Sequence, residues 1–289
     1  MTTYQESLEK LLESKEKTIA LIAPSFPIDF AHPQIIGMLK KLGFDKVSEI
    51  TFGARMTNYW HVEYIKTHPD QKYFITGPCP NCLALIKARY PELLQYVIPF
   101  ASPVISQAKI IRKDFPDYKI VFFAPCQAKQ LLEWPAHKDV LDLVLTFKEL
   151  GEIFSLKGIE ENQFYGQDFE FDSLSAENTK VYPISGGLAK TAMVHDLIPT
   201  EQVWIGDGPP NISKAFDEIR AGTSQYRFFD ILNCGGGCIG GPGLSNTSLP
   251  IDEKIKLIKD YQQKMNSKAA NSEENKPEIV TDIDFSVKL

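Results

Sequence analysis

The 289-residue sequence contains no apolar run close to the roughly 20 residues that a membrane-spanning helix requires. Its first six residues are polar and lack the apolar core of a secretion signal. It also has no excess of positive charge, because 31 basic and 37 acidic residues give a net charge of −6. That balance argues against a protein that holds nucleic acid by a general basic surface. These absences predict a cytoplasmic protein whose partners are neither a membrane nor a nucleic acid.

Cysteine is scarce. Five cysteines in 289 residues are too few for a disulfide scaffold, and the number is odd. In a reducing compartment such cysteines are metal ligands, reactive thiols or small core residues. The hydrophobic content of 43% and charged content of 24% are those of a folded globular chain.

Short apolar runs alternate with amphipathic stretches of helical length. Runs rich in Val, Ile and Phe predict buried strands at 19–23, 73–76, 120–124, 141–146, 181–184 and 228–232. The stretches at 4–14, 33–42, 82–90, 103–114, 127–134, 147–156, 212–221 and 252–265 predict helices. This alternation is typical of an α/β fold with mostly parallel sheets flanked by helices. Residues 266–281 are polar, so we expect a globular part at 1–265 and a flexible C-terminal tail at 266–289. For residues 285–287, docking onto the globular part is the alternative to the expected frayed end.

Four of the five cysteines follow predicted strands. These are Cys79, Cys126, Cys234 and Cys238, whereas Cys82 lies in the first turn of a predicted helix. The carboxyl ends of parallel strands gather along one edge of a sheet, so these distant positions are expected to converge. The start of a helix favours the thiolate, the form that binds metal. Six glycines in 234–243 allow the backbone to approach a bulky cofactor closely.

Three interpretations of the cysteines remain open from their positions alone. A single buried cysteine usually serves as a small apolar residue. A structural zinc site shows two close pairs, and Cys79 with Cys82 and Cys234 with Cys238 have suitable spacing. Zinc leaves Cys126 unexplained, so an iron–sulfur centre is the favoured interpretation.

Three segments resemble the signature loops of iron-only (FeFe) hydrogenases, whose usual forms are TSCCPxW, MPCxxKxxE and ExMACxxGCxxGGGQP. The matching segments are 76–80 (TGPCP), 124–129 (APCQAK) and 234–241 (CGGGCIGG), and intervening matches extend the resemblance over residues 15–250. The resemblance implies a two-lobed domain with the H-cluster in the cleft between the lobes. That cofactor is a 4Fe-4S cubane joined to a two-iron centre with CO, CN and a bridging dithiolate.

The resemblance also assigns residues to the cofactor. It implies that the cubane is held by Cys79, Cys126, Cys234 and Cys238, with Cys238 bridging to the two-iron centre. Lys129 matches the lysine that contacts a cyanide, although an unpaired surface lysine would have the same sequence signature. Three further positions of the cofactor pocket fall on Pro24, Ala124 and Leu232, and the last two replace methionines.

The groups that carry protons in the family are replaced. Pro78 occupies the position of the proton-transferring cysteine, Trp60 and His61 that of an acidic pair, and Ile98 that of a serine. Cys82 and His61 are the candidate substitutes, because the thiol is expected beside Cys79 and histidine titrates near neutral pH. The more common role is a packed helix thiol for Cys82 and an ordinary surface or core histidine for His61.

The sequence therefore predicts a minimal, slow hydrogenase that interconverts protons plus electrons with H2. Loss of the proton route also resembles the sensory branch of the family, which makes an H2- or redox-sensing module the alternative. A plain 4Fe-4S protein without a two-iron centre is the third possibility. The hydrogenase interpretation implies two kinds of partner: an external electron carrier such as a ferredoxin, and the H-cluster maturation proteins.

Overall fold

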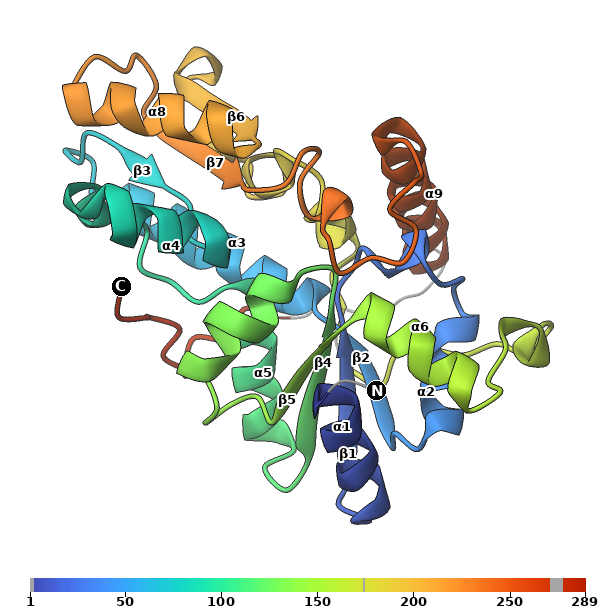
Figure 1. Ribbon diagram of the computed structural model, residues 1–289. Coiled ribbons are helices and arrows are strands. Elements are labelled where there is room, and N and C mark those ends of the chain that lie inside the picture. The colour runs from blue at the N-terminus through green and yellow to red at the C-terminus, as the bar shows by residue number, and fades with distance from the viewer. Residues whose placement is uncertain (1–2, 174, 271–277) are drawn as a thin grey trace.

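Two separate parallel sheets form the framework of the chain. The computed structural model describes residues 3–173, 175–270 and 278–289, and within them one sheet has the strand order β2-β1-β4-β5 and the other β3-β7-β6. The first contains β1 (Thr18–Ile22), β2 (Lys46–Glu49), β4 (Lys119–Ala124) and β5 (Leu143–Thr146). The second contains β3 (Phe74–Ile75), β6 (Val203–Asp207) and β7 (Phe228–Leu232). Figure 1 shows the two sheets as the centres of two lobes.

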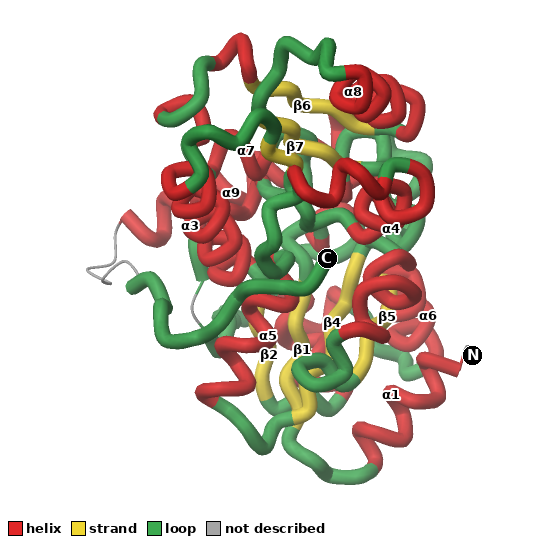
Figure 2. The backbone as a smooth tube through the Cα atoms, turned by 90° about the vertical axis from the view of Figure 1, so that its left-hand side faces the viewer, coloured by secondary structure: helices red, strands yellow, loops and turns green. Residues whose placement is uncertain are grey.

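Helices surround both sheets, as Figures 1 and 2 show. The first lobe is flanked by α1 (Thr3–Glu13), α2 (Gln34–Leu42), α5 (Pro103–Asp114) and α6 (Phe147–Leu156). The second is flanked by α3 (Thr51–Thr67), α4 (Pro80–Arg89), α7 (Gly187–Thr191) and α8 (Pro209–Ala221), and α9 (Ile251–Ala270) packs on the first lobe. The helix starts have clear local causes: Pro80, Pro103 and Pro209 open their helices, and Thr146 with Glu149 forms a capping box on α6. No helix in the described residues is long and apolar enough to cross a membrane.

The α/β prediction is confirmed, and most predicted elements lie within a few residues of the observed ones. The strand predicted at 181–184 is wrong. A 3-10 helix occupies Glu177–Val181, and the Tyr182 N–H donates to the Thr179 carbonyl at 2.9 Å. Pro183, which has no N–H, cannot support a strand ladder here. The helix predicted at 127–134 contains a π-helix at Lys129–Glu133.

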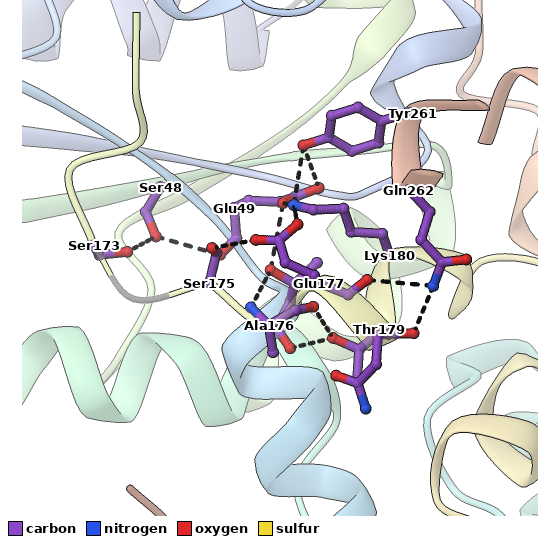
Figure 3. Close-up of polar contacts among 12 residues, drawn as sticks. Ser48, Glu49, Ser173, Ser175, Ala176, Glu177, Thr179, Lys180, Tyr261 and Gln262 are labelled. Atoms are coloured by element: carbon purple, nitrogen blue, oxygen red, sulfur yellow. Dashed lines mark hydrogen bonds and ion pairs between the residues drawn. The ribbon is translucent and has the colours of Figure 1, made fainter. Parts of the chain in front are cut away.

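The segment before residue 181 is anchored by a buried ion cluster, shown in Figure 3. The side chains of Lys180 and Glu49 are completely buried and form an ion pair. Lys180 also contacts Glu177 at 3.2 Å and the Tyr261 hydroxyl at 3.2 Å. Because Glu49 ends β2 and Tyr261 lies on α9, the cluster ties three separate segments together.

The C-terminal segment differs from the expected flexible tail. Helix α9 continues past residue 265 to Ala270, and residues 271–277 of the predicted tail lie outside the described residues. Beyond them, Phe285 is buried against Phe52 and Met56 of α3 and Ile110 of α5. Its carbonyl accepts a 2.8 Å hydrogen bond from the Ala101 N–H. The expectation of a frayed end was therefore wrong, because an apolar side chain fixes it.

Candidate metal centre

The loop after β4 and the glycine-rich loop after β7 are in backbone contact. The Gly243 N–H donates to the Pro125 carbonyl at 2.8 Å. A Cβ on Gly241 would lie 2.2 Å from that carbonyl oxygen, and one on Gly243 would lie 2.8 Å from the Cys126 nitrogen. A side chain at either glycine would push the loops apart, so these glycines bring Cys126 toward Cys234 and Cys238.

Lys129 connects the same loop to the loop after β3. Its Nζ donates to the Pro78 carbonyl at 3.0 Å and pairs with Glu133 Oε2 at 2.7 Å. Both side chains are largely buried, at 14% and 13% exposure, so Lys129 is not a solvated surface lysine. The Trp134 N–H donates to the Lys129 carbonyl, closing the wide turn of a π-helix, a structure frequent at functional sites.

Cys79 and Cys82 lie together in the first turn of α4. Cys79 is the N-cap residue and precedes Pro80, as expected from the sequence. The pKa of the Cys79 thiol falls to about 6, mainly through a hydrogen bond from the Cys82 thiol and despite burial. The same hydrogen bond, with burial, raises the pKa of Cys82 far above its ordinary value. The expected contact between these sulfurs is therefore confirmed, and Cys82 keeps its proton.

The pKa values of the other three thiols depend on burial and on negative charge at the neighbouring cysteines. Burial raises the pKa of Cys126, Cys234 and Cys238, and negative charge on neighbouring cysteines raises each further. The value for Cys234 reaches about 11. Thiols grouped in this way resist losing their protons together unless a cation offsets the charge. The iron of a bound iron–sulfur cluster would supply that cation, so the donor set fits a metal cluster.

The arrangement of the metal-binding side chains does not favour a single bound ion. Across the described part of the chain, no three His, Cys, Asp or Glu side chains are close enough to hold one metal ion. The zinc interpretation requires such a group. Each cysteine of a cubane binds a different iron atom, so its four ligands stand further apart.

The remaining predicted pocket residues end the strands around this centre. Pro24 is buried directly after β1, Ala124 is the buried last residue of β4, and Leu232 is the last residue of β7. Ser25, which the sequence analysis did not select, is completely buried, and its Oγ has no hydrogen-bond partner among the described residues. A buried hydroxyl without a partner costs free energy, so Ser25 is suited to donate a hydrogen bond to a group bound at this strand end.

His61 differs from expectation. Its ring is completely buried on α3, and its Nδ1 donates to the Thr57 carbonyl at 2.8 Å. Burial lowers its pKa to about 4, so it does not titrate near neutral pH. The neighbouring Trp60 stacks on Phe100 and contacts Phe285, and Ile98 is completely buried. The surroundings of the replaced proton-route positions are thus largely apolar.

Two further titratable residues lie near the cysteines. Asp230 on β7 is buried, and burial raises its pKa to about 6 although its Oδ2 accepts a 2.9 Å hydrogen bond from Ala189. The Tyr182 hydroxyl is buried, and the charges of Asp230 and Cys238 add to burial in raising its pKa. An aspartate inside an apolar strand was a visible sequence signal for Asp230, but nothing in the sequence marked Tyr182.

Comparison with known proteins agrees with this site. The family model described as iron only hydrogenase large subunit, C-terminal domain, matches residues 16–242. The periplasmic Fe hydrogenase large subunit of Nitratidesulfovibrio vulgaris is 25% identical over 81% of this chain and 70% of its own length. Iron hydrogenase 1 of Clostridium pasteurianum is 25% identical over 89% of this chain but only 55% of its own length.

Solved structures share the fold. The FeFe-hydrogenase HydA(deltaEFG), from a study of stepwise H-cluster assembly, has a TM-score of 0.69 at 20% identity and covers 87% of this chain and 88% of that one. An apo FeFe-hydrogenase variant from Chlamydomonas reinhardtii has a TM-score of 0.68 at 20% identity, with 87% of each chain covered. Because the family model spans most of the sequence and the cysteine loops fall inside it, the chain belongs to the iron-only hydrogenase large-subunit family.

Proposed function

We propose that this chain binds an H-cluster and interconverts protons plus electrons with H2 at a slow rate. The observation that carries the proposal is the grouping of Cys79, Cys126, Cys234 and Cys238, brought from the strand ends of both sheets. In the proposal these four thiolates bind a 4Fe-4S cubane, and Cys238 also bridges to a two-iron centre. When bound, the cofactor supplies the electron transfer and the metal chemistry, and the protein supplies orientation, electrostatics and proton delivery.

Lys129 and Ser25 are the polar side chains suited to the anionic ligands of the two-iron centre. Lys129 Nζ is already held at the Pro78 carbonyl, so its charge is positioned before any cofactor binds. A fixed cation in a largely buried site stabilises a metal-bound anion more strongly than it would in water. The unpartnered Ser25 hydroxyl provides a second donor from the end of β1.

Slow turnover follows from the residues available for proton transfer. Pro78 has no titratable group, and His61 is neutral at physiological pH because burial lowers its pKa to about 4. Cys82 is the candidate donor that remains, and its raised pKa makes it a weak acid, which supports slow proton delivery. General acid–base assistance typically contributes about 10²–10⁴-fold to a rate, so its weakening lowers turnover without removing the cofactor.

An H2- or redox-sensing role is the alternative function, and one observation favours it. The replaced proton-route positions are packed with apolar side chains, including Trp60, Ile98 and Phe285. A sensor needs the cofactor and its electron exchange but little proton flux. In either role, we propose an external electron carrier such as a ferredoxin, and maturation proteins that deliver the two-iron centre.

Infrared spectroscopy of the protein matured with the two-iron centre tests the cofactor assignment. Metal-bound CO and CN bands, together with a cubane, are the expected result. A cubane without these bands would reduce the function to that of a plain 4Fe-4S protein. H2 turnover at the rate of typical hydrogenases would exclude the sensing role, and its absence in a fully loaded protein would favour that role.

A further inference from the structure

Tyr182 carries a buried hydroxyl that has no hydrogen-bond partner among the described residues. Its ring packs against the apolar cluster that includes Phe74, Leu188 and Phe228. A phenylalanine would fill the same space without a polar atom. Leaving a buried hydroxyl unpaired is unfavourable, so the oxygen requires an explanation beyond packing.

The backbone next to Tyr182 is hydrogen-bonded to the loop that carries Cys238. The Ser185 N–H donates to the Gly236 carbonyl at 3.1 Å, and the Ile239 N–H donates to the Pro183 carbonyl at 3.4 Å. These two hydrogen bonds lie on either side of Cys238 in the sequence. The segment 183–185 is therefore held along the loop that contains a proposed cluster ligand.

The chain on both sides of Tyr182 is held in place. A Cβ on Gly187 would lie 2.8 Å from the Tyr182 Cα, so only glycine permits this close packing. Two residues earlier, Lys180 is held by Glu49 and Tyr261 in the buried cluster of Figure 3. Because both sides of Tyr182 are fixed, its ring is oriented by the surrounding structure before any ligand binds.

Two charged groups act on the hydroxyl, Asp230 and Cys238, because negative charge on each adds to burial in raising the Tyr182 pKa. Asp230 is already occupied: its carboxylate accepts hydrogen bonds at the start of α7, one of them from the Ala189 N–H at 2.9 Å. The Asp230 carboxylate is thus already used by the backbone, and Cys238 is the other charged group that acts on the hydroxyl.

We propose that the Tyr182 hydroxyl donates a hydrogen bond to a sulfur of the iron–sulfur cluster on its Cys238 side. The inference rests on the proposed function, because it requires a cluster to be bound. Hydrogen bonds to cluster sulfurs favour the more negative, reduced state and raise the reduction potential. Tyr182 is thus a residue that tunes the cluster rather than one that holds it.

The test uses the full chain reconstituted with ferrous iron and sulfide, so that it needs neither the two-iron centre nor H2 turnover. The midpoint potential of the cubane is measured in the wild type and in Tyr182→Phe by redox titration followed by electron paramagnetic resonance. We expect the ratio of reduced to oxidised cluster at a fixed potential to fall by roughly tenfold, equivalent to about 59 mV for a one-electron couple. Cluster content should be unchanged, and the apo variant should be no less stable than the wild type.

Tyr73→Phe is the matched control. Tyr73 also has a buried hydroxyl without a partner, but it precedes β3 and so lies at the opposite end of that strand from Cys79. Its removal should leave the potential unchanged. Equal potentials in the wild type and Tyr182→Phe, or an equal shift in Tyr73→Phe, would overturn the inference while leaving the proposed function intact. A wild-type chain that binds no cluster would overturn both.

Discussion

Lys129 Nζ donates a 3.0 Å hydrogen bond to the Pro78 carbonyl and thereby joins the strand-end loops of the two sheets. The positive charge also lowers the pKa of Cys79, together with the larger effect of Cys82. Lys129→Met should therefore raise the pH at which Cys79 in the apo protein reacts with iodoacetamide, from a midpoint near 6. Mass spectrometry of the alkylated peptide gives this profile.

Lys87→Met is the control for that measurement, because Lys87 is an exposed lysine on the same helix, α4. It should leave the Cys79 profile close to that of the wild type. An unchanged midpoint in Lys129→Met would mean that the lysine contributes nothing to the acidity of the site.

The ligand assignment predicts different outcomes for cysteines that are neighbours. Cys79→Ser, Cys126→Ser, Cys234→Ser and Cys238→Ser should each disrupt the cubane, because a serine hydroxyl rarely deprotonates to bind iron. Cys82→Ser is the control and should retain it, since Cys82 only donates a hydrogen bond to Cys79. Iron and sulfide analysis measures the result. Full cluster content in one of the first four variants would remove that residue from the ligand set.

The strand-end cysteines were predictable because a parallel sheet brings its carboxyl ends to one edge whatever the sequence separation. Two strands were not. β2 carries Lys46, Ser48 and Glu49, and its polar pattern makes sense only once Lys180 neutralises Glu49 from 131 residues away. β6 is an edge strand with no fully buried residue, and its apolar run, 203–205, ends at Gly206 and Asp207, so it is too short to indicate a strand by itself.

The two proposed site residues that the sequence analysis missed share one property. Ser25 and Tyr182 are distinguished only by hydroxyls that are buried and unpartnered, which is a fact of three-dimensional packing. The apolar run 181–184 likewise resembles a strand, and only the anchoring of Lys180 and the missing N–H of Pro183 produce another backbone path.

The buried Lys180–Glu49 pair predicts a large effect on stability. Lys180→Met leaves the Glu49 carboxylate buried without its cation, and breaking a buried pair in this way costs about 3–5 kcal/mol. Urea unfolding of the apo protein measures the change. The double variant Glu49→Gln/Lys180→Met should regain part of the loss, because the uncompensated charge is gone.

Lys268→Met provides the comparison, since Lys268 pairs with Asp168 at 3.4 Å on the surface and also joins α9 to the segment before the 3-10 helix at Glu177–Val181. Exposed pairs contribute roughly 0–1 kcal/mol. Similar losses in the Lys180 and Lys268 variants would contradict the role of burial.

The buried His61 ring makes the free energy of unfolding depend on pH. Its pKa is about 4 in the folded protein, against 6.5 as the ordinary value. Above pH 6.5 the ring is neutral in both states, and its contribution is fully present. As the pH falls from 6.5 to 4, only the unfolded chain gains the proton, so the folded state loses up to about 3 kcal/mol.

His61→Gln should therefore flatten the decline in unfolding free energy between pH 6.5 and 4, measured by urea titration at each pH. Burial likewise lowers the pKa of His32 to about 4, so His32→Gln/His61→Gln should flatten the curve further. A decline as steep in both variants as in the wild type would show that other groups cause the acid sensitivity.

Pro78→Cys tests whether proton delivery limits turnover in the proposed function. The proline is buried at the start of the Cys79 loop, and its carbonyl accepts the Lys129 hydrogen bond, which a cysteine backbone can also accept. The new thiol would supply a titratable group beside the proposed two-iron centre. We expect H2 turnover to rise by about 10²–10⁴-fold with unchanged iron content, the range typical of general acid–base assistance. Pro78→Ser is the control, because its side chain is similar in size but does not ionise at neutral pH.

If the fully loaded cysteine variant is no faster than the wild type, then electron entry, or the apolar packing of Trp60, Ile98 and Phe285 further along the route, limits the rate. If the native protein already turns over fast and only Cys82→Ser abolishes this, Cys82 is the working proton donor.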